Sequence, residues 1–399
     1  MTMTQTDTRS STFRDINKPA FMIAAAVIVM LAPNGFNFLP FMLGAAAEVF
    51  ALTPSQIETI TLAELMGTSA ASLVFSLYLM RRSNWRKLLF LAGTALVVGN
   101  LLSIYATSYS DLLAYRVIAS LGQGIGYALG LVGMSVTAHP GRNFGLMMGA
   151  LNIWLLFWLI MVPELMAAYG LTALFLFYAG ASVLVIIAAY WYPDNGRLER
   201  DAQTIEANDG VVHTFRTYMF GALLVLGSFF IYSLSLGIIY PYVEILGGAI
   251  EGVNADSIGL ALAGGTILAI VLCFGAAWLD ERVNHAAFIG IVAVANAIVA
   301  WQMAEAQDAT TYLVMAGLYV GLWNLYYARA FTAIANADHS GYASSFGPEI
   351  SAAGIAIGPM IAQAATISGD FAGQVMVGVY AIVIGGVVCI FGMTRKPKV

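Results

Sequence analysis

Residues 110–130 read SDLLAYRVIASLGQGIGYALG, an apolar stretch that nevertheless contains an arginine. At about 1.5 Å per residue, such a helix is long enough to cross the roughly 30 Å hydrocarbon core of a bilayer. Small residues recur every four positions, a spacing that lets membrane helices pack closely, at Gly122, Gly126 and Gly130. A polar stripe lies within about 60° on a different face, formed by Arg116, Ser120, Gln123 and Tyr127. The stretch predicts a membrane helix with one packing face and one polar face.

The rest of the chain has the composition of a membrane protein. Of its 399 residues, 60% are hydrophobic and 10% are charged, whereas soluble domains are about 45–50% apolar and about 25% charged. Twelve apolar segments are long enough to span a bilayer, at residues 20–45, 55–80, 88–107, 111–137, 143–168, 171–192, 215–242, 255–279, 286–304, 310–336, 342–367 and 371–393. We predict an all-α membrane protein with twelve transmembrane helices.

A long polar interruption divides these segments into six and six. We therefore expect two pseudo-symmetric six-helix bundles, with an N-terminal tail at 1–18, a first bundle at 19–192, a linker at 193–214, a second bundle at 215–393 and a C-terminal tail at 394–399. The sequences HPGRNFGLMMGA from His139 and HSGYASSFGPEI from His339 follow equivalent helices, about 200 residues apart. Duplicated halves that bind a solute at their interface are a transporter architecture.

Basic residues predict the orientation. Fifteen of the 17 Lys and Arg residues fall in the termini and alternate loops, and the other two, Arg116 and Arg329, fall inside helices. Because cytoplasmic loops carry an excess of Lys and Arg, we expect both termini to be cytoplasmic. The N-terminal segment lacks the features of a signal peptide, so we expect it to remain as a cytoplasmic tail of a bacterial inner-membrane protein.

These features resemble the major facilitator superfamily across essentially all twelve helices. RVIASLGQGIGYALG is similar to that family's R-x-x-x-G-x-G signature, with Arg116 as its arginine. The family's loop motif G-x-x-x-D-R-x-G-R-K is matched in part by YLMRRSNWRKLL, where Arg82 replaces the acidic residue, and its second-half counterpart GAAWLDERVNH keeps an acid at Asp280. The resemblance implies alternating access, a substrate between the bundles lined by helices one, four, seven and ten, and a role for Asp280 in closing the cytoplasmic side. The Gly-Pro-rich signature of drug–proton antiporters is missing from helix five.

Helix one is interrupted at about mid-depth. Its sequence APNGFNFLP places Pro33, Gly35 and Pro40 beside two amides, Asn34 and Asn37. Broken helices are tolerated in membranes where they face protein or a wet cavity, and in transporters they often mark the binding site. A simple packing kink is an equal alternative.

Glu64 in helix two lies on the side that also carries Thr61, Thr68 and Ser72. Glu64 and Arg116 are expected about 15 Å and 8 Å from the outer ends of their helices, in the same half of the membrane. Burial raises the pKa of a carboxylate and a nearby arginine lowers it, and a proton-coupling site requires such a competition. Two alternatives stay open, a permanent Glu64–Arg116 ion pair and a Glu64 bonded only to hydroxyl groups.

A second pair is predicted in the second half. Arg329 and Glu349 lie at equal depth, about 12 to 13 Å from the cytoplasmic face, on consecutive antiparallel helices. We expect them to form an ion pair with a structural or gating role, ahead of direct contact with substrate. An ionisable group inside the membrane is a functional hypothesis by default.

Aromatic and amide side chains complete the expected binding site. Tyr319, Trp323 and Tyr326 share one face of helix ten, with Asn324 and Tyr327 turned away. Polar aromatic residues at mid-depth favour a pocket wall, since lipid-facing ones prefer the interfaces. The predicted substrate-binding residues are Asn34, Asn37, Arg116, Gln123, Tyr127, Asn152, Tyr232, Tyr319, Trp323 and Tyr326, with Glu64 and Arg116 for proton coupling.

Catalysis is not indicated. The four histidines lie far apart near loops, both cysteines lie in apolar runs, and no HExxH, GxSxG or nucleotide-binding motif occurs. We expect no enzyme, no cofactor, no metal, no nucleic-acid partner and a monomer in the lipid bilayer. The predicted function is proton-coupled symport of a small organic anion, with aromatic anions among the candidates. The alternatives are a proton-coupled efflux antiporter of amphipathic or cationic compounds and a non-transporting membrane receptor or enzyme.

Overall fold

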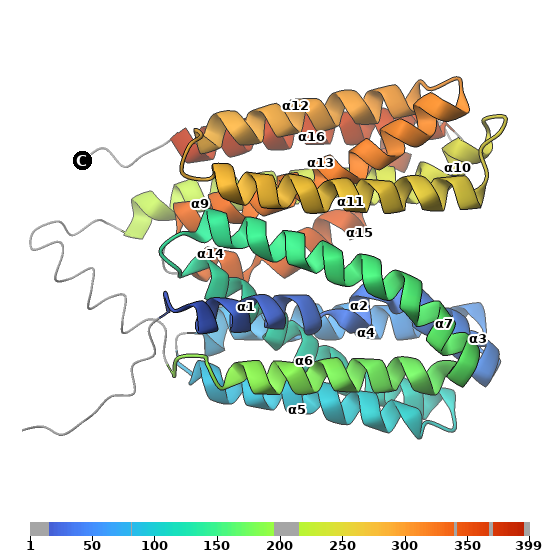
Figure 1. Ribbon diagram of the computed structural model, residues 1–399, viewed down its shortest axis with the longest axis vertical. Coiled ribbons are helices and arrows are strands. Elements are labelled where there is room, and N and C mark those ends of the chain that lie inside the picture. Colours follow the sequence, from blue (N-terminus) through green and yellow to red (C-terminus); the bar gives the residue numbers. More distant parts are fainter. Residues whose placement is uncertain (1–15, 81, 195–214, 339–340, 367–369, 395–399) are drawn as a thin grey trace, which may run out of the picture.

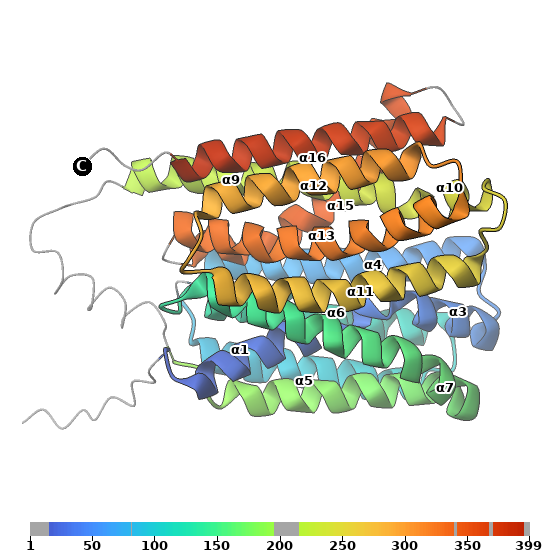
Figure 2. The same cartoon turned by 45° about the horizontal axis from the view of Figure 1, so that its top comes forward.

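The computed structural model describes residues 16–80, 82–194, 215–338, 341–366 and 370–394. Its long helices run side by side along one common direction (Figures 1 and 2). The expected tails at 1–18 and 394–399 and the linker at 193–214 lie almost wholly outside the described residues.

The first half of the chain forms one group of helices. Their bounds are α1 Pro19–Leu31, α2 Asn34–Asn37, α3 Leu39–Phe50, α4 Pro54–Val74, the π-helical continuation η1 Phe75–Leu79, α5 Trp85–Ile104, α6 Tyr109–Ser135 and α7 Pro140–Ala189. The 50-residue α7 contains two of the predicted spans, and the chain reverses between them at Gly170, whose φ of 67° is in the left-handed region. Glycine adopts this conformation at little steric cost.

The second half forms the other group. It comprises α9 Phe215–Ile239, the short η2 Tyr240–Tyr242, α10 Val243–Gly248, α11 Ala255–Leu279, α12 His285–Ala304, α13 Ala309–Ala337, α14 Tyr342–Ser345, α15 Gly347–Ala365 and α16 Phe371–Thr394. In Figure 1 most of these helices lie above those of the first half, and α7 and α11 meet where the two groups touch.

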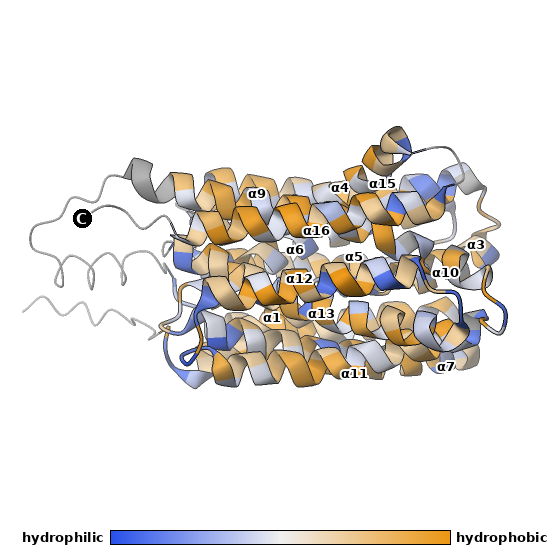
Figure 3. Ribbon diagram, turned by 90° about the horizontal axis from the view of Figure 1, so that it is seen from above, coloured by the Kyte–Doolittle hydropathy of each residue, from blue (hydrophilic) through white to orange (hydrophobic). Residues whose placement is uncertain are grey.

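The helices are those of an integral membrane protein. Among the described residues, eight helices are long and apolar enough to cross a membrane, counting α7 once. Seen from above, hydrophilic residues gather at the two ends and hydrophobic residues cover the middle (Figure 3). The other predicted spans correspond to helices that are interrupted, α1 to α3 and α14 with α15, and to α13, which contains Asn324 and Arg329.

The two ends of the bundle differ in charge. The end that carries Arg82, Arg86, Lys87, Arg142 and Arg282 is called the basic end below. The opposite end carries Glu48, Asp111, Asp256, Glu305, Asp308 and Asp370, and is called the acidic end.

Equivalent helices in the two halves begin in the same way. Asn84 before α5 and Asn284 before α12 each accept a hydrogen bond from the backbone N–H three residues on. Ser108 before α6 and Asp308 before α13 do the same. Such N-caps stabilise a helix start by about 1 kcal/mol. Each pair is 200 residues apart, which agrees with the repeat in the sequence, although His339 itself lies outside the described residues.

Glycines bring α6 close to three neighbouring helices. Gly122 lies against the Ala92 carbonyl of α5, whereas Gly126 and Gly130 lie against Ala32 and Val29 in the first helical segment. The expected glycine face therefore contacts two helices and not one. A fourth glycine, Gly124, lies against the backbone carbonyl of Thr68 in α4.

We predict that Gly124→Ala destabilises the protein by about 1 to 3 kcal/mol, because the added Cβ would overlap the Thr68 carbonyl, and overpacking against backbone cannot be relieved by turning a side chain. Thermal unfolding of the detergent-purified protein measures this. Gly264→Ala in α11 is the matched control, since its Cβ would meet nothing within 4 Å. Equal unfolding temperatures for the two variants would contradict the prediction.

Candidate functional site

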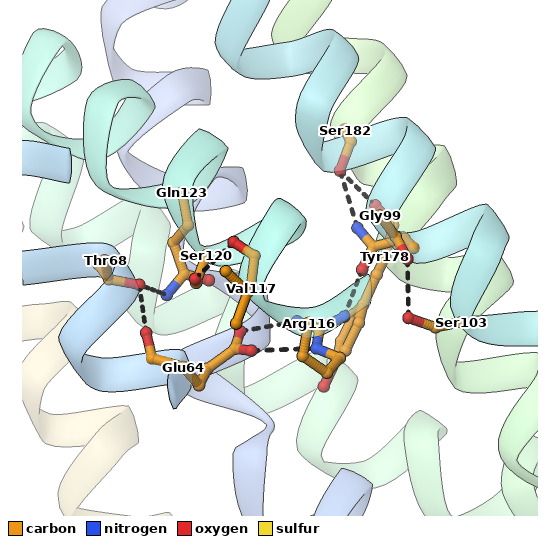
Figure 4. A network of polar contacts seen from close by, with 11 residues as sticks. Glu64, Thr68, Gly99, Ser103, Arg116, Val117, Ser120, Gln123, Tyr178 and Ser182 are labelled. Atoms are coloured by element: carbon orange, nitrogen blue, oxygen red, sulfur yellow. Dashed lines mark hydrogen bonds and ion pairs between the residues drawn. The ribbon is translucent and has the colours of Figure 1, made fainter. Parts of the chain in front are cut away.

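The centre of the first half contains a buried ion pair. Arg116 Nε donates to Glu64 Oε2 at 3.0 Å, and Arg116 Nη2 donates to Glu64 Oε1 at 2.6 Å (Figure 4). Arg116 is 1% exposed and Glu64 is fully buried. Two parallel hydrogen bonds between a guanidinium and a carboxylate form the strongest kind of ion pair. Of the alternatives left open by the sequence, the structure contains the Glu64–Arg116 pair.

A third helix holds the remaining nitrogen of the arginine. Arg116 Nη1 donates to Asn100 Oδ1 on α5 at 2.7 Å, and Asn100 in turn donates to Ser182 on α7 at 3.4 Å. The guanidinium also lies 5.7 Å from the ring centroid of Tyr178. Sequence reasoning missed Asn100, although a single amide in the apolar run LVVGNLLSI was a signal for it. All three guanidinium nitrogens are thus bound by protein.

The polar stripe of α6 continues from the ion pair toward α4. Gln123 Nε2 donates to Thr68 Oγ1 at 2.9 Å, and Thr68 Oγ1 donates to the Glu64 carbonyl at 2.8 Å. The other side of the Gln123 amide, Oε1, is buried without a hydrogen-bond partner in the described part of the chain.

The interrupted first helix lies directly against this pair. Gly35 in α2 leaves so little space that a Cβ there would lie 2.5 Å from Glu64 Oε1 and 2.8 Å from Arg116 Nη2. Asn34 accepts a hydrogen bond from Trp154 of α7 at 3.1 Å. The side-chain nitrogens of Asn34 and Asn37 are buried without a hydrogen-bond partner among the described residues. The break in the helix therefore brings amide groups and a glycine to the polar centre.

An amide pair connects the two halves of the protein. Asn152 of α7 donates to Asn324 Oδ1 of α13 at 3.2 Å. Asn324 and Tyr327, which lie off the face that Tyr319, Trp323 and Tyr326 share, are therefore also directed to protein partners. Tyr327 forms hydrogen bonds with Ser233 of α9 at 3.0 Å and with Ser351 of α15 at 2.8 Å.

The predicted aromatic face lies partly inside the second half. Tyr326 stacks on Tyr232 with ring centroids 3.5 Å apart, and both residues are fully buried, as is Tyr319. Trp323 is half-buried and contacts Tyr240 and Tyr327. Helical periodicity grouped these residues correctly but did not show which side of α13 faces the first half.

The expected Arg329–Glu349 ion pair is wrong. Arg329 Nη1 donates to Asp280 at the end of α11 at 2.6 Å, and Arg329 Nη2 donates to the carbonyl of Ala276. Asp280 also lies against Gly141 in the first turn of α7 and 3.6 Å from His285 Nδ1. Arg329 and Glu349 were expected at equal depth on neighbouring helices, but depth alone does not determine where a side chain points. The side chain of Arg329 points toward α11 and not toward α15.

Glu349 has a different environment. Both of its carboxylate oxygens are buried and have no hydrogen-bond partner among the described residues. Ser72 of α4 and Tyr127 of α6, which belong to the first half, lie beside it. The carboxylate therefore lies where the two halves meet.

The two halves are in close contact near the basic end. Ser76 donates to the Ser345 carbonyl at 3.0 Å, Phe144 stacks on Phe331, and Gly145 lies against Ala277. At the surface of this end, His139 Nδ1 lies 3.3 Å from Glu281. These contacts close the basic end of the interface.

A cavity of about 410 Å³ opens elsewhere, between α3 and α7 near the acidic end. Its lining includes Phe41, Glu48, Met166 and the Gly170 turn. None of the predicted site residues lines it, so it is separate from the polar centre described above.

Together these features define a class of protein: a helical membrane protein in two halves, with buried polar and charged groups at and beside the contact between the halves. The chain has the major facilitator fold. It is similar to the transporter FucP in the outward conformation, with a TM-score of 0.74 and 14% identity over 96% of this chain and 100% of that one.

Two further solved structures have the same fold. The proton:xylose symporter XylE has a TM-score of 0.72 at 14% identity, covering 92% of this chain and 94% of that one. The human organic anion transporter MFSD10 has a TM-score of 0.70 at 11% identity, covering 93% of this chain and 100% of that one. No protein-family model and no curated protein sequence matches the chain.

Proposed function

We propose that this chain is a secondary active transporter that carries a small organic solute across a membrane by alternating access, in symport with protons. The basic end faces the cytoplasm in this proposal, because basic residues concentrate on that side of membrane proteins. The observation that carries the proposal is the set of polar groups buried at mid-depth where the two halves meet, including the Asn152–Asn324 pair.

The geometry favours a solute that forms hydrogen bonds. The amide groups of Asn34, Asn37 and Gln123 keep atoms that are free of protein partners within the described residues, and such atoms are available to hydroxyl or amide groups of a solute. The symporters FucP and XylE carry fucose and xylose respectively. We therefore propose an uncharged polyhydroxylated solute as the first candidate.

The expected organic anion has less support. That expectation depended on Arg116, whose nitrogens are bound by Glu64 and Asn100, so an anion would have to displace a buried carboxylate. The similarity to MFSD10 keeps organic anions among the compounds to test. A second candidate function is efflux of cationic compounds, which the unpartnered carboxylate of Glu349 favours.

We predict that proteoliposomes containing the protein accumulate a sugar or polyol when an inward proton gradient is imposed. Uptake of labelled sugars, organic acids and organic cations, with and without the gradient, measures this. Accumulation that ignores the gradient would contradict proton coupling, and preference for acids or for cations would replace the proposed solute class. Asn152→Leu is expected to abolish uptake, whereas Gly264→Ala, at an exposed position where the added Cβ meets nothing within 4 Å, should transport at the parental rate.

A further inference from the structure

We propose that Glu349 is a proton-binding site, protonated while the basic end is closed and ionised when that end opens. This inference deepens the proposed function and depends on it for its role in transport. Glu64 is paired with Arg116. Among the described residues at the interface, Glu349 is the one buried carboxylate without a cationic partner.

The carboxylate is held between the two halves. Glu349 lies in the first turn of α15, and its oxygens are shielded from solvent. Ser72 of α4 lies beside it, and the Ser72 hydroxyl also has no hydrogen-bond partner among the described residues. The Ser72 hydroxyl can donate to an ionised carboxylate and can equally accept from a carboxylic acid, so it can serve either form. One neutral hydroxyl does not replace the water that an ionised carboxylate loses on burial, so the protonated form is favoured in the closed arrangement.

No cationic side chain in the described residues forms an ion pair with the Glu349 carboxylate. Two titratable side chains lie on the facing helices: Tyr127 of α6, which interacts with Glu349, and Tyr327 of α13, whose hydroxyl contacts Ser351. The arginines of the neighbouring helices α6 and α13 are bound elsewhere, Arg116 to Glu64 and Arg329 to Asp280. Of the described parts of α9, α14 and α16, none forms an ion pair or hydrogen bond with the Glu349 carboxylate. Burying an unpaired ionised carboxylate is costly, and such a group neutralises instead.

Opening the basic end changes this balance. Separation of α4 from α15 exposes the carboxylate to water, which stabilises the ionised form, and Glu349 then loses its proton to the solvent on that side. Because the closed state binds the proton more tightly, a lower pH favours the closed state and a higher pH favours the open state. A proton that Glu349 takes up from the acidic-end side can therefore be released at the basic end when that end opens.

We test the inference with nitroxide labels on Arg82→Cys and Arg282→Cys, two exposed positions at the basic end on opposite halves. The native cysteines Cys273 and Cys389 are buried, so labelling is directed to the introduced pair. Pulsed electron paramagnetic resonance on the full-length protein, from about pH 5 to about pH 9, the range above the ordinary titration of a glutamate, reports the distance between the labels. We expect a short distance at low pH and a growing longer-distance population as the pH rises.

Variants assign the response to one residue. Glu349→Gln mimics the protonated form and should keep the short distance at every pH, whereas Glu349→Asp should keep a pH response. Glu164→Gln, at an exposed glutamate of α7, is the matched control and should behave like the parent. A Glu349→Gln variant that responds to pH like the parent would overturn the inference, as would distances that respond to sodium ions and not to pH. A correct pH response without uptake of any tested solute would instead reject the proposed function and leave the proton site standing.

Discussion

Arg116→Gln is expected to destabilise the protein by about 3 to 5 kcal/mol, the cost of removing one partner of a buried ion pair and leaving the other charge uncompensated. Glu64 has no solvent exposure, and its carboxylate accepts both hydrogen bonds from Arg116. The loss should appear as a lower unfolding temperature of the detergent-purified protein and as poor recovery from membranes. Glu64→Gln should behave similarly, because it leaves a buried guanidinium with only the Asn100 contact.

The double variant Glu64→Gln/Arg116→Gln measures the interaction between the two residues separately from the effect of each single substitution. With both charges removed, the two amides can hydrogen-bond to each other, and we expect a smaller loss of stability than in either single variant. Arg116→Lys should be intermediate, since an ammonium cannot reproduce the two parallel bonds of the guanidinium. If Arg116→Gln unfolds at the parental temperature, the pair does not contribute to stability and the prediction fails.

The same variants examine the proposed role of Glu64 in proton coupling. If the double variant folds and still accumulates solute in response to a proton gradient, proton coupling does not depend on Glu64. That outcome would agree with proton binding at Glu349. A double variant that folds, exchanges solute, but no longer responds to the gradient would return the coupling role to Glu64. Stability and transport are measured separately for this reason.

Much of the fold could be predicted from the sequence because hydrophobic length is a local property. The apolar segments, the break near Asn34 and the polar stripe that begins at Arg116 all depend on residues adjacent in sequence. The Glu64–Arg116 contact was one of several alternatives because both residues lie in the same half of the membrane, on helices of the same bundle. The structure selects it through the packing of α4 against α6.

The remaining parts of the site depend on rotation of helices about their axes, which sequence spacing does not determine. Arg329 and Glu349 are at similar depth, yet Arg329 points to Asp280 and Glu349 to Ser72. The contact of Asn324 with Asn152 of α7 could not be predicted for the same reason. Each of these directions is set by contacts with a helix far away in the sequence, so only the assembled bundle reveals them.

The Asp280–Arg329 ion pair at the basic end provides the second large effect. Asp280→Asn is expected to increase the rate at which the basic end opens by about tenfold, which corresponds to about 1.4 kcal/mol. The reason is that the Asp280 carboxylate joins Arg329 to the first turn of α7, where the positive end of the helix dipole stabilises an anion. Alkylation of Ser345→Cys, at a fully buried interface position, measures opening, because the thiol reacts only when the halves separate.

A neighbouring acid supplies the control for that experiment. Glu281 is one residue on and lies 3.3 Å from His139, but the two side chains are 67% and 59% exposed. Exposed ion pairs contribute little, at most about 1 kcal/mol, so Glu281→Gln should change the alkylation rate far less than Asp280→Asn does. Gly141→Ala should accelerate alkylation without altering any charge, because its Cβ would overlap the Asp280 carboxylate. Equal rates for Asp280→Asn and Glu281→Gln would show that closure depends on the packing of Phe144 on Phe331 and not on the buried carboxylate.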